Sequence, residues 1–403
     1  MKPGSMSISA TVVALALTGA QSFADSGPFL EGRAVLPANT VAPGPACGTL
    51  LVPGVINGIT IPWPSQVVQG FSALGRGREP DEYLAMPDNG FGGKAPSKDF
   101  LLRAYYVKID FKTAQGGTGD VEVRDFISFR DPDHKIGFPI VNEETARRDL
   151  TGFDLDPESL QRDGNGDLWM GEEFGPWIVH FDSTGRLLEA PYGIDVKSPN
   201  NPFLGGQPAT QPNSRGFEGM AMSPNGRYLY AALEGPKVAD SDQSRRWIYE
   251  FSVCRKAFTG RTWQYRTESA AYMISDMYML DTHRIVVMER DGGRGLGANF
   301  RSVYVLDLRN LDDDGFLHKA AALDMTAIPD PDLVSLPAIH EGDVGLGDPF
   351  RVTCESVEAV YPLDGERVII GCDNNIPNTG RNPGIADDNE FILVRIPGLK
   401  SLK

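Results

Sequence analysis

The chain has 403 residues, including 45 glycines and 30 prolines, and its formal net charge is −16. This acidic balance argues against nucleic acid or an anionic membrane as a partner, because both require a basic surface. Short runs rich in β-branched and aromatic residues recur between the glycines and prolines, and helical periodicity is nearly absent. The sequence therefore predicts an all-β fold.

The first residues have the pattern of a secretory signal peptide. Lys2 precedes a short apolar run, and Ser22-Phe23-Ala24 offers a small-x-small cleavage site. No later stretch is apolar and long enough to cross a bilayer. We therefore expect a periplasmic or secreted protein whose mature chain has no transmembrane segment. The expected segments are a signal peptide at 1–24, an N-terminal extension at 25–64 and a propeller domain at 65–403.

One short pattern recurs along the chain: an acidic residue, a hydrophobic stretch, a turn, a second hydrophobic stretch and another acidic residue. Its four copies lie at 158–173, 218–234, 276–289 and 355–373, and a version at 70–110 lacks the first acid. Repeats at intervals of about 60 to 80 residues are typical of propeller blades. We expect a single β-propeller, with five to seven blades and six as the leading count. Six blades would close the ring if residues 29–36 pair with C-terminal strands.

The repeated acidic residues are candidate metal ligands. Counting back from each hairpin turn places them together at one end of the first two strands of each blade, near the central channel. Like charges gathered there are destabilising unless a cation or basic groups compensate, although single acids at strand ends are ordinarily solvated. Oxygen ligands favour calcium, with magnesium second, and disfavour zinc. The candidates are Glu158, Glu172, Glu218, Glu289, Glu355 and Asp373.

Two arginines are expected at the same end as these acids. Arg215 lies three residues before Glu218, and Arg290 directly follows Glu289. Their guanidinium groups could bind an anionic substrate in a fork, or they could simply neutralise the neighbouring acids. The motifs G-x-S-x-G and H-E-x-x-H are both missing from the sequence. Catalysis would then rely on a metal-polarised ester or a metal-activated water.

Other polar motifs give weaker indications of a metal site. Asp163-Gly-Asn165-Gly-Asp167 resembles half of a calcium loop, but it lacks the glycine and the bidentate glutamate of that motif, so an ordinary turn is the preferred interpretation. The five histidines show no ligand spacing. Residues 190–214, 291–299 and 376–388 are expected as long loops around one mouth of the ring.

The four cysteines can pair if the protein is exported. Cys354 and Cys372 flank a hairpin that turns at Asp364-Gly365, so they should lie nearly opposite each other on adjacent strands. We predict a disulfide there, with buried free thiols as the alternative. Cys47 and Cys254 would form a second bridge by elimination.

Over about residues 65 to 397, the chain resembles the phytase-like β-propeller family, which is often described as "esterase-like activity of phytase". The resemblance depends on motifs at 152–176, 215–233, 274–291, 355–358, 372–375 and 387–391. It implies an exported propeller with phosphoester or ester hydrolysis as the family activity.

We therefore expect a metal-dependent phosphoric or carboxylic ester hydrolase, with a small anionic or ester substrate and a monomeric state. The alternative is a non-catalytic propeller that binds a ligand or partner protein, with a structural calcium or none.

Overall fold

The computed structural model describes Met1 and residues 27–402, and the expected signal peptide lies outside the described residues apart from Met1. Among the described residues, no helix is long and apolar enough to cross a membrane. Strands dominate this part of the chain, with two short 3₁₀ helices at Gly295–Gly297 and Leu399–Ser401. The predicted all-β class is confirmed.

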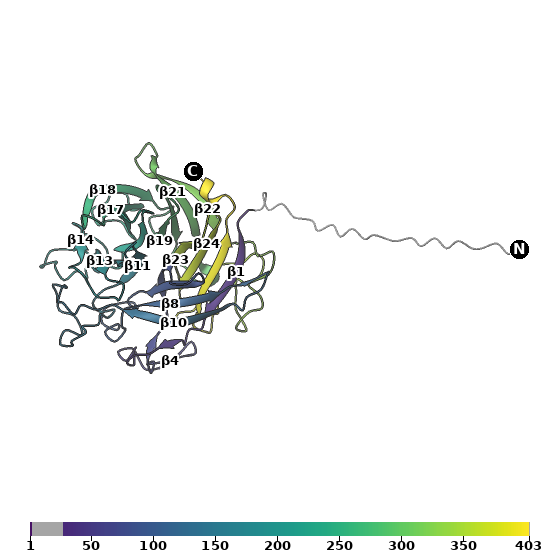
Figure 1. Ribbon diagram of the computed structural model, residues 1–403, viewed down its shortest axis with the longest axis horizontal. Coiled ribbons are helices and arrows are strands. Elements are labelled where there is room, and N and C mark those ends of the chain that lie inside the picture. The colour runs from purple at the N-terminus through teal and green to yellow at the C-terminus, as the bar shows by residue number, and fades with distance from the viewer. Residues whose placement is uncertain (2–26, 403) are drawn as a thin grey trace.

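The described strands form a propeller of five blades around one axis (Figure 1). The first blade contains β6 (Phe71–Arg76), β7 (Glu82–Pro87), β8 (Arg103–Asp110) and β10 (Asp120–Ser128). The second contains β11 (Pro157–Arg162), β12 (Leu168–Glu172), β13 (Trp177–Phe181) and β14 (Tyr192–Gly193). The third contains β15 (Phe217–Met222), β16 (Tyr228–Leu233), β17 (Arg245–Ser252) and β18 (Ala257–Arg266).

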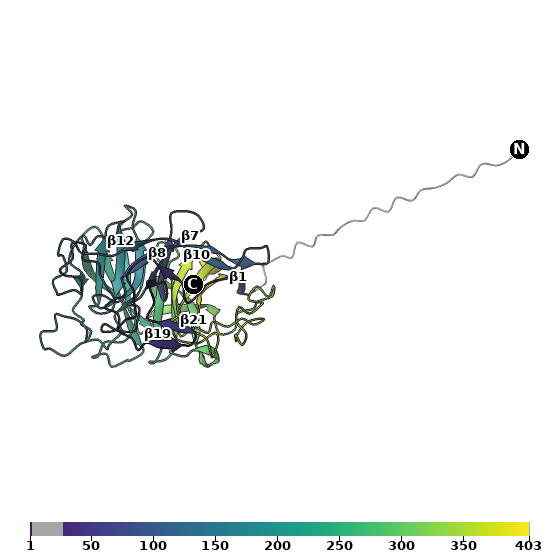
Figure 2. The same cartoon turned by 90° about the horizontal axis from the view of Figure 1, so that it is seen from below.

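The last two blades complete the ring. The fourth contains β19 (Met273–Met279), β20 (Arg284–Arg290), β21 (Arg301–Leu311) and β22 (Leu317–Asp324). The fifth contains β23 (Ser356–Pro362), β24 (Arg367–Asp373), β25 (Asn389–Arg395) and β1 (Phe29–Leu36). Figure 2 shows the ring turned by 90°, with strands of several blades running between its two faces. Short additional strands are β2 (Val41–Ala42), β3 (Gly54–Ile56), β4 (Ile59–Ile61), β5 (Gln66–Val67) and β9 (Lys112–Thr113).

The innermost strands β6, β11, β15, β19 and β23 contact one another in turn, and β23 returns to β6. Apolar side chains of neighbouring blades pack face to face between them. Met277 and Ile285 of the fourth blade, for example, share one buried cluster with Ala221 and Ile248 of the third. Because the inner strands are covered on both faces, most of their residues are buried, and these include polar side chains such as Glu158 and Glu358.

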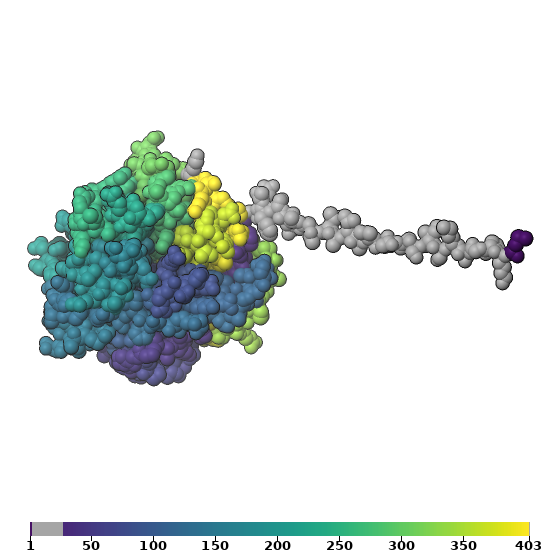
Figure 3. Space-filling view, viewed as in Figure 1, coloured from purple at the N-terminus to yellow at the C-terminus, as the bar shows by residue number. Residues whose placement is uncertain are grey.

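The ring is closed by the N-terminal strand, as predicted, but with five blades in the described chain where six were favoured. β1 pairs antiparallel with β25 from Phe29–Arg395 to Leu36–Asn389. The C-terminal part of the chain provides only three strands of the fifth blade, so β1 becomes its fourth strand and adds no sixth blade. In Figure 3 the yellow C-terminal surface borders the blue surface of the N-terminal third. Closure removes the exposed strand edges that an open array would have.

The predicted disulfide between Cys354 and Cys372 is present, with Cα atoms 6.1 Å apart. The second predicted bridge is wrong, since Cys47 and Cys254 are both free thiols. Cys47 is buried, and its Sγ donates to the Ser65 carbonyl at 3.1 Å, whereas Cys254 is exposed. Elimination failed because the two residues lie in parts of the fold that do not meet.

Candidate metal centre at the propeller axis

Each innermost strand has a β-bulge near its first residues. The register of the pairing with the second strand shifts at this point in all five blades. A bulge leaves one residue without a partner in the ladder and turns its side chain in a new direction. The residues at the bulges are Ser72, Glu158, Glu218 with Gly219, Ser275 and Glu358. Three blades therefore supply a glutamate at the equivalent position.

The three bulge glutamates meet although they come from different blades. Glu158, Glu218 and Glu358 each have a carboxylate oxygen within 4.8 Å of the other two. Two further trios overlap with this one, and every member of them is buried. We call the combined group the axial carboxylate cluster; it consists of Asp156, Glu158, Glu173, Glu218, Glu234 and Glu358.

Burial and mutual repulsion make ionisation costly in this cluster. Burial and then the neighbouring carboxylates, beginning with Glu218, raise the pKa of Glu158 well above its ordinary value. The pKa of Glu218 is raised in the same way, by burial and then by Glu234 and Glu358. Burial and the charge of Glu172 raise the pKa of Asp156 to about 7. These carboxyl groups therefore hold their protons more strongly than solvated carboxyl groups do.

Two arginines compensate part of this charge. Arg290 Nη2 lies 2.7 Å from Glu358 Oε1 and 3.5 Å from Glu234 Oε1, and its side chain is only 8% exposed. Arg215 Nη1 lies 2.6 Å from Glu234 Oε2, and its side chain is 37% exposed. Two guanidinium groups thus face six carboxylates. The structure places both predicted arginines beside the acids, with Arg290 enclosed between two of them and Arg215 still open to solvent.

Unpartnered oxygen atoms lie in the same region. Within residues 27–402, Asp156 Oδ1 and Asn89 Oδ1 are buried without a hydrogen-bond partner. The side chains of Asp156 and Asn89 also interact with each other. A buried oxygen without a donor is costly unless a cation or water satisfies it. The donor set, which consists of carboxylates and an amide oxygen, suits a hard divalent cation such as calcium.

The six metal ligands predicted from the sequence separate into two groups. Glu158 and Glu218 lie in the axial carboxylate cluster. Asp373 lies next to it, where burial and then the charges of Asp88 and Glu358 raise its pKa. Gly70 has φ +69°, and a Cβ there would stand 2.6 Å from Asp373 Oδ1. Gly70 therefore leaves the space that Asp373 occupies.

The other three predicted ligands are engaged elsewhere. Glu172 accepts hydrogen bonds from the backbone N–H groups of Phe174 and Gly175 at 2.9 and 2.7 Å, so its carboxylate holds the turn after β12. Glu289 interacts with the hydroxyl of Tyr265 and with Lys319. Glu355 is 36% exposed at its side chain and accepts from Asn378 Nδ2 at 2.8 Å.

Sequence reasoning missed four members of the cluster, although they lie in or beside the repeats: Asp156, Glu173, Glu234 and Glu358. A hairpin without a bulge pairs Asp276 with Glu289, whereas the structure pairs Ile274 with Glu289 and Asp276 with Met288. Because each inner strand has one extra residue at its bulge, the acids beyond the bulge face partners one position away from those that a regular hairpin would give them. In β23, the single acid Glu358 within an otherwise mostly apolar strand is a signal that could have identified the bulge position.

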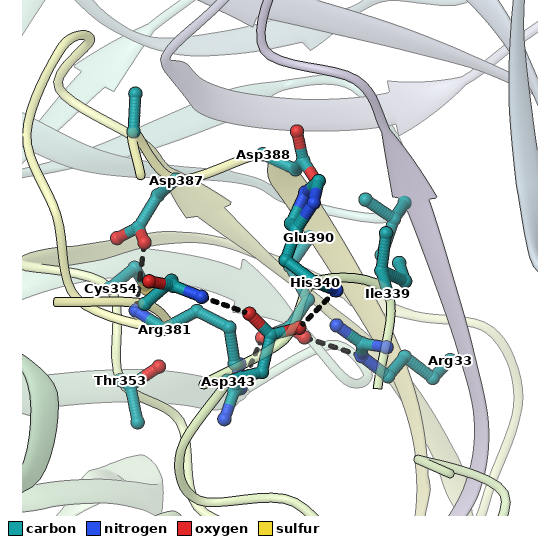
Figure 4. Close-up of a pocket in the computed structure, with 13 residues that line it drawn as sticks. Arg33, Ile339, His340, Asp343, Thr353, Cys354, Arg381, Asp387, Asp388 and Glu390 are labelled. Atoms are coloured by element: carbon teal, nitrogen blue, oxygen red, sulfur yellow. Dashed lines mark hydrogen bonds and ion pairs between the residues drawn. The ribbon is translucent and has the colours of Figure 1, made fainter. Parts of the chain in front are cut away.

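A separate charged pocket lies between β1, β25 and the loops at 330–354 and 376–388 (Figure 4). Glu390 accepts from Arg33 Nε at 2.5 Å and from Arg381 Nη2 at 2.6 Å. Nearby, His340 Nε2 lies 3.0 Å from Asp388 Oδ2. Both arginines of this pocket are thus paired with Glu390, and the Arg33–Glu390 pair joins β1 to β25.

Comparison with known proteins agrees with this architecture. The sequence model of the phytase-like family, described as "Esterase-like activity of phytase", matches residues 66–376. An uncharacterized secreted protein of Arthroderma benhamiae is 23% identical over 189 residues, and the alignment spans 37% of this chain and 37% of that protein.

Similar solved structures include a luciferin-regenerating enzyme, with 11% identity, a TM-score of 0.40, and coverage of 94% of this chain and 97% of that one. A GH43 β-1,3-galactosidase has 8% identity and a TM-score of 0.42, with coverage of 89% and 59%. At TM-scores below 0.5 these two similarities carry no argument about function.

Proposed function

The chain belongs to the phytase-like family, and we propose that it is an exported, calcium-dependent hydrolase of phosphoesters or other esters that acts at the axial carboxylate cluster. The observation that carries this proposal is the meeting of six buried carboxylates from three blades, with Arg215 and Arg290 paired to two of them. Export is supported by the N-terminal sequence pattern, by the Cys354–Cys372 disulfide and by the secreted relative.

The proposed ligands are drawn from the cluster, with Glu158, Glu218 and Glu358 at the axis and Asp156 and Glu173 beside them. A divalent cation bound there would polarise a phosphoryl or carbonyl oxygen and lower the pKa of water. Calcium is preferred to magnesium because many carboxylates converge without strict octahedral geometry. Asp373 remains a proposed ligand at the edge of the site.

Arg215 is the proposed contact for an anionic substrate. Its guanidinium group is fixed by Glu234 at one side and is partly exposed at the other, so it can still donate to a phosphate or carboxylate oxygen. Arg290 has its guanidinium group between Glu234 and Glu358, so we assign it mainly to holding these carboxylates in place.

The depth of the cluster favours one alternative, a non-catalytic propeller with a structural calcium that binds a ligand or partner protein. Glu218 is only 3% exposed, and Glu158 is 8% exposed. A cation among such buried ligands could stabilise the ring without meeting a substrate.

The decisive experiment combines metal analysis with turnover. Purified protein is assayed on aryl phosphates, phytate, aryl esters and lactones, with calcium and after chelation. Glu218→Gln removes one cluster charge at nearly constant volume, and Glu366→Gln is the control because Glu366 is exposed. Loss of turnover in Glu218→Gln and after chelation, but not in the control, supports the hydrolase. Bound calcium without turnover on any substrate class supports the alternative, and the absence of bound metal contradicts the calcium-dependent hydrolase.

A further inference from the structure

A second group of potential metal ligands lies on the second blade, away from the axis. Asp163 and Asp167 belong to the turn between β11 and β12, and His180 lies on β13. One ligand atom of each residue lies within 4.8 Å of the others. Glu158 is near the start of β11 and Asp163 follows its end, so this strand of roughly 17 Å separates the group from the axial carboxylate cluster.

His180 is held in one orientation. It is 4% exposed, and its ring stacks on Trp169 with centroids 3.7 Å apart and planes inclined by 10°. Its Nδ1 lies 2.8 Å from Glu189 Oε2, and Glu189 is also paired with Lys256. An ionised carboxylate only accepts hydrogen bonds, so Nδ1 carries a proton that it donates to Glu189. The other ring nitrogen, Nε2, is then directed at the aspartates.

The surroundings of Nε2 lack a donor or acceptor at hydrogen-bond distance. Within the described part of the chain, this buried atom has no hydrogen-bond partner, and Asp167 Oδ2 lies 3.5 Å away. That separation is longer than a normal hydrogen bond, and a lone pair facing a carboxylate is repulsive. Two ligands about 2.1 Å from one tetrahedral ion lie about 3.4 Å apart. The distance therefore fits two ligands of a shared cation.

Asp163 is also positioned by the turn. Its Oδ1 accepts from the backbone N–H groups of Asn165 and Asp167 at 2.8 and 3.1 Å, and its Oδ2 accepts from Trp169 Nε1 at 3.2 Å. A carboxylate has about four lone-pair sites, so acceptor capacity remains. An imidazole in the donor set favours a transition metal over calcium, which distinguishes this group from the axial carboxylate cluster.

We propose that Asp163, Asp167 and His180 bind one divalent first-row transition-metal ion such as Zn²⁺. Glu189 is the positioning residue, since it orients the imidazole as carboxylates beside metal-bound histidines do. The ion would tie the β11–β12 turn to β13 and so stabilise the outer part of the second blade. The proposal is independent of the hydrolase activity proposed above.

The test is a Zn²⁺ titration of the full mature protein, first freed of transition metals and kept saturated with Ca²⁺ to occupy the axial site. Calorimetry should find one Zn²⁺ per chain, with a rise in Tm. His180→Gln and Asp167→Asn should each weaken Zn²⁺ binding at least 10-fold. Glu189→Gln should weaken it about 10- to 100-fold, the usual effect of losing such a partner. When Co²⁺ replaces Zn²⁺, its absorption spectrum should indicate a nitrogen ligand. Asp167→Asn should change this spectrum.

Two controls keep the result specific. His283 also lies near two aspartates, at 3.6 Å from Asp281 and 3.7 Å from Asp307, but its side chain is 29% exposed. His283→Gln should leave Zn²⁺ binding unchanged, and so should Glu218→Gln. Asp167 is partly exposed, so Asp167→Asn should remain folded by circular dichroism. Zn²⁺ binding that is equal in wild type, His180→Gln and Asp167→Asn overturns the proposal. The proposal is also overturned if the wild-type protein does not bind Zn²⁺. In that case NMR would find both ring nitrogens of His180 protonated.

Discussion

Asp156→Asn should make the metal-free protein less sensitive to pH. Burial and the charge of Glu172 raise the pKa of Asp156 from its ordinary 3.8 to about 7. Between these values the folded state binds more protons than the unfolded state, so the free energy of unfolding falls as the pH rises. At about 1.4 kcal/mol per pH unit, and with the folded group only half protonated by pH 7, the loss between pH 5 and pH 7 from this group is about 2 kcal/mol. Asparagine cannot ionise, so the variant lacks this loss.

The assay is urea unfolding in the presence of chelator at pH 5, 6 and 7. The wild-type free energy of unfolding should fall by about 2 kcal/mol more than that of Asp156→Asn over this range. Asp313→Asn serves as the control, because Asp313 is exposed in a turn. Added calcium should restore wild-type stability more strongly at pH 7 than at pH 5, because the cation competes with protons for the carboxylates and fewer protons are bound at the higher pH. Equal pH dependence in wild type and Asp156→Asn would refute the reasoning.

Three further variants test other parts of the molecule. Glu390→Gln leaves the buried Arg33 and Arg381 without their partner, so the free energy of unfolding should fall by about 3 kcal/mol in urea; an unchanged value would show that the ring closure does not depend on this pair. Replacing Cys354 and Cys372 together by serine removes the cross-link between residues 18 positions apart. The free energy of unfolding should fall by about 3 kcal/mol, which a lower Tm would reveal, whereas Cys254→Ser should leave Tm unchanged. Glu289→Gln should lower Tm but leave calcium affinity unchanged by calorimetry, because Glu289 interacts with Tyr265 and Lys319; weaker calcium binding would return Glu289 to the ligand set.

Much of the fold could be predicted because blades are local. Each repeat is a hairpin whose strands are neighbours in sequence, so apolar runs, turns and acids at 218–234 or 355–373 identify a blade without knowledge of its surroundings. The pairing of residues 29–36 with the C-terminal strands was also predictable, because an open ring would expose strand edges. The number of blades was not, since it depends on whether the last repeat supplies three strands or four.

The composition of the axial carboxylate cluster depended on tertiary structure to a larger extent. The sequence by itself determined that acids recur at one end of the inner hairpins, and this identified Glu158 and Glu218. It did not determine where each ladder has its extra residue, so Glu289 was favoured over Glu358. The bulges are seen only in the register of the paired strands, and the acids they turn meet only in the closed ring.

The outer site of the second blade shows the same division. Sequence alone determined the turn from Asp163 to Asp167, and the histidines had no ligand spacing along the chain. Only the folded blade brings His180 next to that turn, because β13 pairs with β12 and places His180 opposite Trp169. Pairing between strands joins residues that are distant in sequence. Local chemistry can therefore be derived from the chain, whereas the meeting of ligands from different strands and blades is decided by the tertiary structure.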